Sequence, residues 1–291
     1  MSQLILTLVS HIMENGPANC ILCGSRKTEL LIEVDNWKIM RCSECGLGIL
    51  DPRPSPDEIK KLYSGHYFSD HYDQGLKIDS KRFERRIRSE THRINFFKRL
   101  KREGRVLDIG CGYGYFLYAC RLFGYNVHGL EVSEWAYRYG SEKLKLPISL
   151  GDIEDVHFEA KSFDVITMWH FLEHTFDPRR YIKRASEWLR RDGILIVDVP
   201  NYRGTDAMKT WNTWQGWDVP FHLYHFTPET LKRILIKFGF RPIKSKDYLS
   251  EYVKDRLNRS IHISSLSRFI AGFFSGHSIA IASKQSFPND K

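Results

Sequence analysis

The feature that most constrains the fold is an apolar run followed at once by alternating glycines, VLDIGCGYGY at residues 106–115. The apolar run is typical of a strand buried in a parallel sheet. The glycines permit a sharp turn and let a ligand approach the backbone, because no Cβ atom stands in the way. They are Gly110, Gly112 and Gly114. The segment therefore predicts a strand, a ligand-binding turn and a helix that starts at Tyr115.

A carboxylate follows at a matching distance. A second strand is expected over residues 126–130, and Glu131 ends it about 20 residues after the first glycine. A carboxylate in this position can accept hydrogen bonds from both hydroxyls of a ribose. The two segments together predict a pocket for an adenosine-like cofactor at the carboxyl edge of a parallel sheet.

Two details separate this pocket from a dinucleotide site. The glycines read G-x-G-x-G, so Tyr115 stands where a dinucleotide site has its third glycine. Its bulk would hinder the close helix–strand packing that a pyrophosphate site needs. Asp108 lies in the strand end, where a nicotinamide-binding strand is normally apolar. An acid beside the loop suits a ligand with an amino group and a sulfonium charge.

With these residues the sequence resembles the class I S-adenosylmethionine-dependent methyltransferases, and the resemblance continues in order for about 200 residues from position 80. Residues 151–153 look like the adenine-binding turn, residues 163–168 like the fourth strand, and residues 191–201 like the fifth. Residues 169–174, followed by Asp177 and Pro178, look like the loop and helix that close over the methyl donor. A doubly wound fold without this cofactor is the alternative.

The resemblance implies an α/β fold, with a Rossmann-like, seven-stranded, mostly parallel sheet and helices on both faces. It also implies S-adenosyl-L-methionine as the cofactor. The residues that the resemblance assigns to the donor site are Asp108, Gly110, Cys111, Gly112, Gly114, Tyr115, Glu131, Val132, Asp152, Ile153, Trp169 and His170.

Four of the six cysteines form two C-x-x-C pairs, each followed by a glycine: Cys20 with Cys23, and Cys42 with Cys45. The gap between the pairs is typical of a zinc ribbon. Four thiolates fill a tetrahedral Zn²⁺ shell and leave no position for water, so the pattern predicts a structural zinc site. A cytosolic disulfide pair is the alternative, and the expected compartment argues against it.

We expect three parts in the chain: a zinc ribbon over residues 1–50, a linker with a short helix over 51–79, and a methyltransferase domain over 80–291. Within the last, residues 200–228 are expected to form a lid over the acceptor site. The proline-rich start of the linker excludes a regular helix or central strand. The cysteine module, this linker and its tyrosines resemble a methyltransferase subgroup of deoxysugar, cell-surface polysaccharide and secondary-metabolite pathways. By that resemblance Tyr67 touches the substrate, or else it joins the module to the body.

Charge and hydropathy give broader expectations. The net charge is +9, and much of it lies in an expected helix that leads into the first strand, between Lys81 and Arg105. A solvated basic face is the favoured interpretation, and attraction of a phosphorylated or nucleic-acid substrate is the other. No apolar run approaches the ~20 residues of a membrane helix. The apolar stretch at residues 264–274 is expected to pack on the sheet edge. The N-terminus lacks the pattern of a signal peptide, so we expect a cytoplasmic protein.

Methylation of a hydroxyl or an acidic C–H requires removal of a proton, and histidine suits that task near neutral pH. Histidines flank the expected fourth-strand loop (His170 and His174) and the segment before the next helix (His222 and His225). In the sugar C-methyltransferases that this chain resembles, two such histidines line the acceptor site. Their positions match His174 and His222, which we predict to be catalytic. The match is partial, because their tyrosine three residues before the base is Val219 here and their long C-terminal domain is missing.

The sequence favours a methyltransferase that acts on a small molecule, for example a nucleotide-linked sugar or glycan precursor. A quinol-precursor O-methyltransferase is a second option, since the H-x-x-E-H loop resembles that group as well. An RNA or other nucleic-acid methyltransferase is the alternative from another class. The fourth strand argues against it, because the Asn/Asp-Pro-Pro-aromatic motif of base-methylating enzymes is absent there. A non-catalytic adaptor is a third alternative. The expected state is a monomer or homodimer.

Overall fold

The computed structural model describes residues 19–55, 57–59, 75–261, 264–271 and 274–286. Most of the expected linker helix and Tyr67 lie outside these residues.

A central sheet in the order β10-β11-β8-β7-β4-β5-β6 organises the described chain. The strands from β4 to β8 run parallel, and β11 runs antiparallel to both of its neighbours. The predicted seven-stranded, mostly parallel sheet is therefore confirmed. Its strands are β4 (Arg105–Ile109), β5 (Asn126–Glu131), β6 (Ile148–Leu150), β7 (Phe163–Trp169), β8 (Leu189–Pro200), β10 (Phe240–Leu249) and β11 (Ser275–Gln285).

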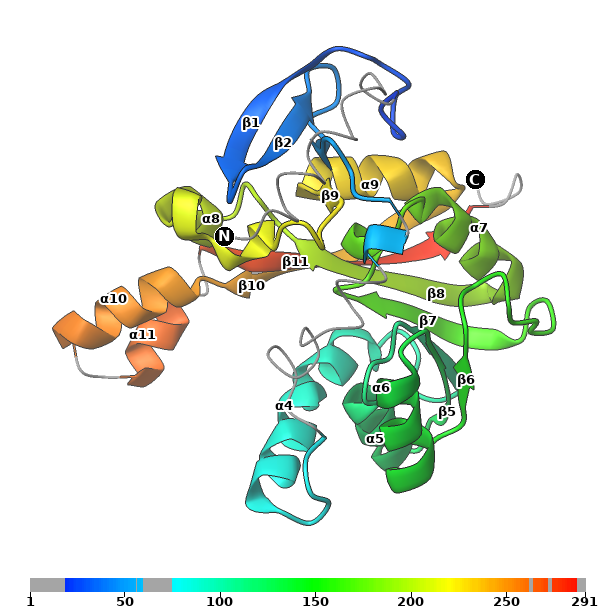
Figure 1. Cartoon of the computed structure of the whole chain (residues 1–291). Helices are drawn as coiled ribbons and strands as arrows, with labels where there is room; N and C mark the ends of the chain where they lie inside the picture. The colour runs from blue at the N-terminus through cyan, green and yellow to red at the C-terminus, as the bar shows by residue number, and fades with distance from the viewer. Residues whose placement is uncertain (1–18, 56, 60–74, 262–263, 272–273, 287–291) are drawn as a thin grey trace.

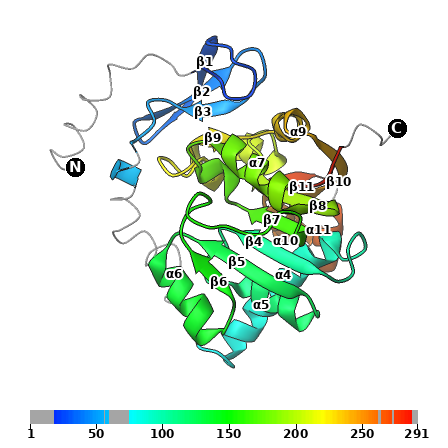
Figure 2. The same cartoon turned by 90° about the vertical axis from the view of Figure 1, so that its right-hand side faces the viewer.

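Helices cover both faces of the sheet, because side chains alternate between its two sides. In β4, Leu107 and Ile109 join the cluster that contains the buried residues of α7 and α9, whereas Val106 joins that of α4 and α5. Figures 1 and 2 show these two layers on opposite sides of the sheet. The helices are α4 (Lys81–Phe97), α5 (Tyr115–Leu122), α6 (Glu134–Arg138), which continues as η1 (Tyr139–Lys143), α7 (Pro178–Trp188) and α9 (Pro228–Lys237).

Residues that favour the start and the end of a helix lie at the two ends of α9. Thr227 caps the helix by accepting a hydrogen bond from the backbone N–H of Thr230, and the Thr230 hydroxyl accepts one from the backbone N–H of Thr227. Pro228 occupies the first turn, where its missing N–H costs nothing. Gly239 follows the helix with a φ of 79°, a left-handed conformation that favours glycine. This helix starts directly after the segment that carries the candidate histidines.

A second, four-stranded sheet forms the N-terminal module in the order β1-β2-β3-β9. Three strands come from the module itself: β1 (Thr28–Val34), β2 (Trp37–Cys42) and β3 (Gly48–Leu50). The fourth, β9 (Tyr224–His225), comes from the segment before α9 and pairs antiparallel with β3. Figure 2 shows the module above the main sheet, with β9 between them. The module therefore pairs directly with the chain that carries the candidate histidines.

Of the remaining helices, the single turn η2 (Leu172–His174) lies between β7 and α7 in the sequence, and the others lie between β8 and β11. A short α8 (Thr205–Lys209) is followed by the single turns η3 (Trp211–Thr213) and η4 (Gln215–Trp217). Between β10 and β11, α10 (Glu251–Ile261) and α11 (Ser264–Ala271) form a projecting pair (Figure 1). The prediction that residues 264–274 pack on the sheet edge is wrong, because α11 packs mainly on α10. In the described part of the chain, no helix has the length and hydropathy required to span a membrane.

Candidate functional site

The glycine loop is tied to the end of β5 by Glu131. All three glycines of the loop have positive φ, at 74°, 53° and 79° along the chain. The backbone N–H of Gly112 donates to Glu131 Oε2 at 2.7 Å, and that of Ser133 donates to Oε1 at 2.8 Å. An ionised carboxylate has about four acceptor positions, so Glu131 retains capacity for ribose hydroxyls. The side chain is buried, which holds this carboxylate at a fixed place beside the loop.

Asp108 lies below the loop in a buried polar contact. The Thr167 hydroxyl of β7 donates to Asp108 Oδ1 at 2.6 Å. Burial raises the pKa of Asp108 to about 7, although the Thr167 hydrogen bond and the nearby Arg93 charge act in the opposite direction. A cationic ligand beside this carboxyl group would favour its ionised form.

Arg93 departs from the solvated basic face that the sequence predicts for its helix. Its side chain is 19% exposed, and its Nη1 donates to the buried Glu90 at 3.0 Å. The guanidinium lies 5.0 Å above the centroid of the Trp169 ring. Arg93 Nε and Trp169 Nε1 are buried without a hydrogen-bond partner among the described residues. Arg93 therefore has free donor capacity near Asp108, and its place in a basic helix gives no sign of this in the sequence.

The adenine-side residues lie at the next strand ends. Asp152 follows β6 and accepts a hydrogen bond from the Tyr181 hydroxyl of α7, while Ile153 is fully buried. Phe171 packs on Tyr181 and against Gly110, where an added Cβ would meet its ring at 2.1 Å. Among the other donor-site candidates, Val132 is exposed, Cys111 is buried against Gly129, and the Tyr115 hydroxyl accepts a hydrogen bond from the backbone of Leu76.

This arrangement fits the cofactor that the sequence implies. It combines a ribose-type carboxylate, an adenine-side acid and a third carboxyl group next to the glycine turn. The unpartnered Nε of Arg93 could serve an anionic group of the same ligand, and donors of this kind bind carboxylates strongly. A zwitterionic nucleoside therefore suits the donor set.

The candidate histidines of two distant segments meet next to this edge of the sheet. Glu173, His174 and His222 each place one ligand-type atom within 4.8 Å of the others. The rings of His174 and His222 are perpendicular, with centroids 4.5 Å apart. The backbone N–H of Leu223 donates to the carbonyl of Glu173 at 2.9 Å, which holds the two segments together. The two histidines predicted to be catalytic thus lie side by side, joined by a glutamate that the sequence analysis did not select.

His222 has a defined tautomer. Its Nδ1 lies 2.9 Å from the carbonyl oxygen of Gly216, which can only accept, so Nδ1 carries the hydrogen. The lone pair is therefore on Nε2, 3.6 Å from Asp218 Oδ2. Burial, followed by the neighbouring His222 charge, lowers the pKa of His174 to about 3. His174 is consequently neutral throughout the physiological pH range.

His170 and His225 lie on either side of this group. His170 has a φ of 49°, and its ring nitrogens lie 3.5 Å from Glu173 and 3.7 Å from Asp198. Burial opposes protonation of His170, but these two carboxylates raise its pKa. His225 is buried in β9, and burial keeps its pKa well below the usual range.

The tryptophan-rich segment before His222 is mostly core. Trp214 and Trp217 are buried, and their rings are perpendicular at a centroid distance of 5.0 Å. Trp217 also packs on His225 and donates from Nε1 to the carbonyl of Trp211 at 2.6 Å. Through these contacts the tryptophan rings support the segment that carries His222 and His225.

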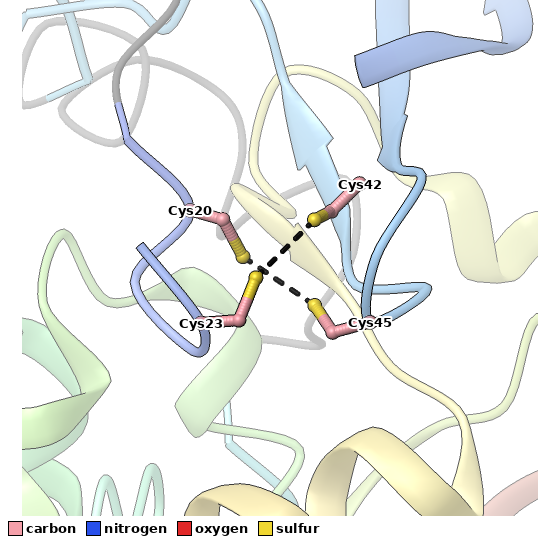
Figure 3. A group of neighbouring side chains, drawn as sticks. All are labelled: Cys20, Cys23, Cys42 and Cys45. Carbon is pink, nitrogen blue, oxygen red and sulfur yellow. Dashed lines mark hydrogen bonds between the residues drawn. The ribbon is translucent and has the colours of Figure 1, made fainter. Parts of the chain in front are cut away.

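The four cysteines of the N-terminal module converge (Figure 3). The Sγ atoms of Cys20 and Cys45 lie 3.5 Å apart, as do those of Cys23 and Cys42, and all four lie within 4.8 Å of one another. These separations suit four thiolates around one tetrahedral ion with bonds of about 2.3 Å. All four cysteines are free of disulfides.

Comparison with known proteins agrees with this geometry. A family model described as a methyltransferase domain matches residues 78–245, more than half of the chain. The chain belongs to this family. A ubiquinone biosynthesis O-methyltransferase of Coxiella burnetii is 33% identical over 101 residues, which are 33% of this chain and 43% of that protein. The methyltransferase-domain match with this curated relative thus spans less than half of the relative's length.

Two solved structures share the fold of this methyltransferase domain. A SAM-dependent methyltransferase from Archaeoglobus fulgidus has a TM-score of 0.52 and 23% identity, over 70% of this chain and 94% of that one. The 1,6-didemethyltoxoflavin-N1-methyltransferase of Burkholderia thailandensis has a TM-score of 0.53 and 17% identity, over 90% of this chain and all of that one. At these identities the likeness concerns the fold alone.

Proposed function

We propose that the protein transfers a methyl group from S-adenosylmethionine to a small molecule. The observation that carries the proposal is the glycine turn held against the buried carboxylate of Glu131, with Asp108 and Asp152 at the adjoining strand ends. Family membership and the fold support it. The donor-site residues expected from the sequence keep their assigned roles in this proposal.

We also propose that Arg93 binds the carboxylate of the donor. S-adenosylmethionine has an amino-acid end, and its carboxylate would pair with the unpartnered Nε of Arg93. The ammonium and sulfonium charges of the same ligand would be stabilised by Asp108. Each charged end of the ligand then faces an opposite charge.

For the acceptor, we propose a hydroxyl or carbon of a nucleotide-linked sugar or glycan precursor, with His222 and His174 as the catalytic histidines. The donor supplies an activated methyl group, so the protein mainly aligns the nucleophile, excludes water and assists loss of a proton. His222 assists through the lone pair on Nε2, which its contact with Gly216 keeps available. A quinol precursor is the second candidate, favoured by the name of the Coxiella burnetii relative.

The proposal includes the organisation of the chain. The four cysteines hold a structural Zn²⁺, residues 1–50 form the zinc ribbon, residues 51–79 form the linker, and residues 200–228 cover the acceptor in a domain of residues 80–291. The module belongs to the sugar and polysaccharide subgroup, and the protein acts in the cytoplasm as a monomer or homodimer. The pairing of β3 with β9 supports a role of the module at the acceptor site.

A screen with isotopically labelled S-adenosylmethionine tests this function. Nucleotide sugars and quinol precursors are incubated with the protein, and a labelled methyl group is detected by mass spectrometry. His222→Ala should abolish transfer while donor affinity is retained, and the exposed-residue variant His157→Ala should behave as wild type. Full activity of His222→Ala would refute the role of His222. Absence of donor binding to the wild type would refute the function.

A further inference from the structure

Glu173 is a buried carboxylate that the described chain leaves without hydrogen bonds. Its side chain is 0% exposed, and neither oxygen has a hydrogen-bond partner among the described residues. An ionised carboxylate in such a place is costly unless a positive charge lies against it. The nearest charged candidate is His170, whose Nδ1 lies 3.5 Å from Oε1, beyond the usual hydrogen-bond length. The position therefore favours a bound cation.

The neighbouring His222 is oriented as metal-binding histidines are. Such histidines nearly always donate their second ring N–H to a carbonyl or carboxylate, which fixes the tautomer and the ring plane. His222 has this contact through Nδ1 to the carbonyl of Gly216, so its Nε2 lone pair remains for a ligand. The hydrogen bond from Leu223 to the carbonyl of Glu173 keeps that lone pair near the carboxylate.

We propose that Glu173, His174 and His222 form a site for one divalent transition-metal ion, separate from the four cysteines. Their ligand atoms lie within 4.8 Å of one another. Around a tetrahedral ion with metal–ligand bonds of about 2.1 Å, two ligand atoms lie roughly 3.4 Å apart. A contraction of at most about 1.4 Å closes the site, within the reach of side-chain adjustment. Two imidazoles and one carboxylate suit Zn²⁺ and neighbouring divalent ions of the first transition-metal row. Three protein ligands leave one position open.

The role of this ion rests on the proposed function, whereas its presence does not. A hydroxyl of the acceptor bound at the open position has a lowered pKa, so it loses its proton to water. The oxygen then forms a bond to the methyl carbon, the bond from that carbon to sulfur breaks, and S-adenosylhomocysteine leaves. In the metal-bound protein His222 thus assists proton loss as a ligand.

Metal analysis of the full-length protein tests the site. The protein is loaded with Zn²⁺ and dialysed against a weak chelator, and zinc per chain is then measured by mass spectrometry. The wild type should retain two equivalents, and Glu173→Gln and His222→Asn should each retain one. The control variants Glu159→Gln and His157→Ala, at exposed positions of the same chemistry, should retain two. One equivalent in the wild type, or two in both site variants, would overturn the proposal.

Cobalt distinguishes the two sites by their ligands. Co²⁺ bound by thiolates has intense sulfur-to-metal charge-transfer absorption, whereas Co²⁺ bound by imidazole and carboxylate lacks it. The second equivalent of Co²⁺ should add only weak visible bands, and Glu173→Gln should remove these bands alone. Circular dichroism shows whether each variant is folded. Titration with S-adenosylmethionine is carried out separately, so a failure of the proposed methyl transfer is recognised independently of the metal count.

Discussion

The two halves of the proposed active site are built in different ways. The donor half, comprising the β4–α5 glycine loop, Asp108, Glu131 and Asp152, uses consecutive strand ends of one sheet. The acceptor half, comprising the four-cysteine module, β9 and the Glu173–His174–His222 cluster, joins segments that are far apart in the sequence. A change in the acceptor half should therefore affect turnover, while a change in the donor half should affect cofactor affinity. The predictions below test this separation.

The largest effect is expected for Cys42→Ser, which removes one buried sulfur atom from the four-cysteine cluster. The module should unfold, because its few core residues would depend on the proposed Zn²⁺. β9 then loses its partner strand, and misplacement of the histidine segment should lower turnover about 100-fold. The affinity for S-adenosylmethionine should change by less than about twofold, since distant sites are nearly independent.

Calorimetry and an activity assay on Cys42→Ser and on the surface control Glu44→Gln check this result. Normal turnover without zinc, or an equal loss of donor affinity, would show that the two halves do not separate.

Arg93→Lys tests the donor half. Lysine keeps the positive charge but lacks the planar guanidinium group with its several N–H donors. One charge-assisted hydrogen bond to the carboxylate of S-adenosylmethionine is therefore lost. The affinity for S-adenosylmethionine should fall by about tenfold or more, in line with the strength of such bonds. Arg88→Lys, at an exposed position of the same helix, is the matched control. Unchanged affinity in isothermal titration would exclude Arg93 from the donor site.

Asp108→Asn should improve stability while it weakens donor binding. Burial raises the pKa of Asp108 from 3.8 to about 7 in the folded protein. As the pH rises between these two values, the carboxyl group therefore loses its proton in the unfolded chain but keeps it in the folded protein. The free energy of unfolding of the wild type falls over this range as a result. The stability advantage of the variant should therefore grow by roughly 2–3 kcal/mol between about pH 5 and about pH 8. Urea unfolding at the two pH values measures it. An advantage that shrinks as the pH rises would contradict the assignment.

Gly48→Ala tests the contact between the module and β9. An added Cβ would lie 2.7 Å from the Cβ of His225, so the pair must shift. The expected loss is about 1–3 kcal/mol of stability, as for other overpacked sites. Turnover should fall while donor affinity is unchanged. Lys38→Ala, at an exposed position on the neighbouring strand β2, serves as the control. Equal midpoints of thermal unfolding for the two variants would argue against tight β3–β9 packing.

The sequence predicts the glycine loop and its contact with Glu131 well, because both depend on local signals. The spacing of the glycines and the acid at the end of the next strand place the loop and Glu131 without knowledge of distant contacts. The same holds for the four cysteines, whose two pairs lie on adjacent turns of one short module. In both cases a few consecutive residues determine the geometry.

The acceptor half is only partly predictable. His174 and His222 were selected from their loops, and the structure places them together. The strand pairing that brings β9 to the module has no local signature, because β9 is two residues long. Arg93 is a charged residue in a basic helix that looks solvent-exposed, and Glu173 lies in a short loop without a periodic pattern, so only tertiary packing buries them. The periodicity of a polar stretch does not show which of its charged residues becomes buried.

The most direct test is calorimetric titration of the wild-type protein with S-adenosylmethionine and, separately, with a nicotinamide dinucleotide. The account predicts saturable binding of one S-adenosylmethionine per chain and no heat from the dinucleotide. Binding of the dinucleotide without any response to S-adenosylmethionine would contradict it.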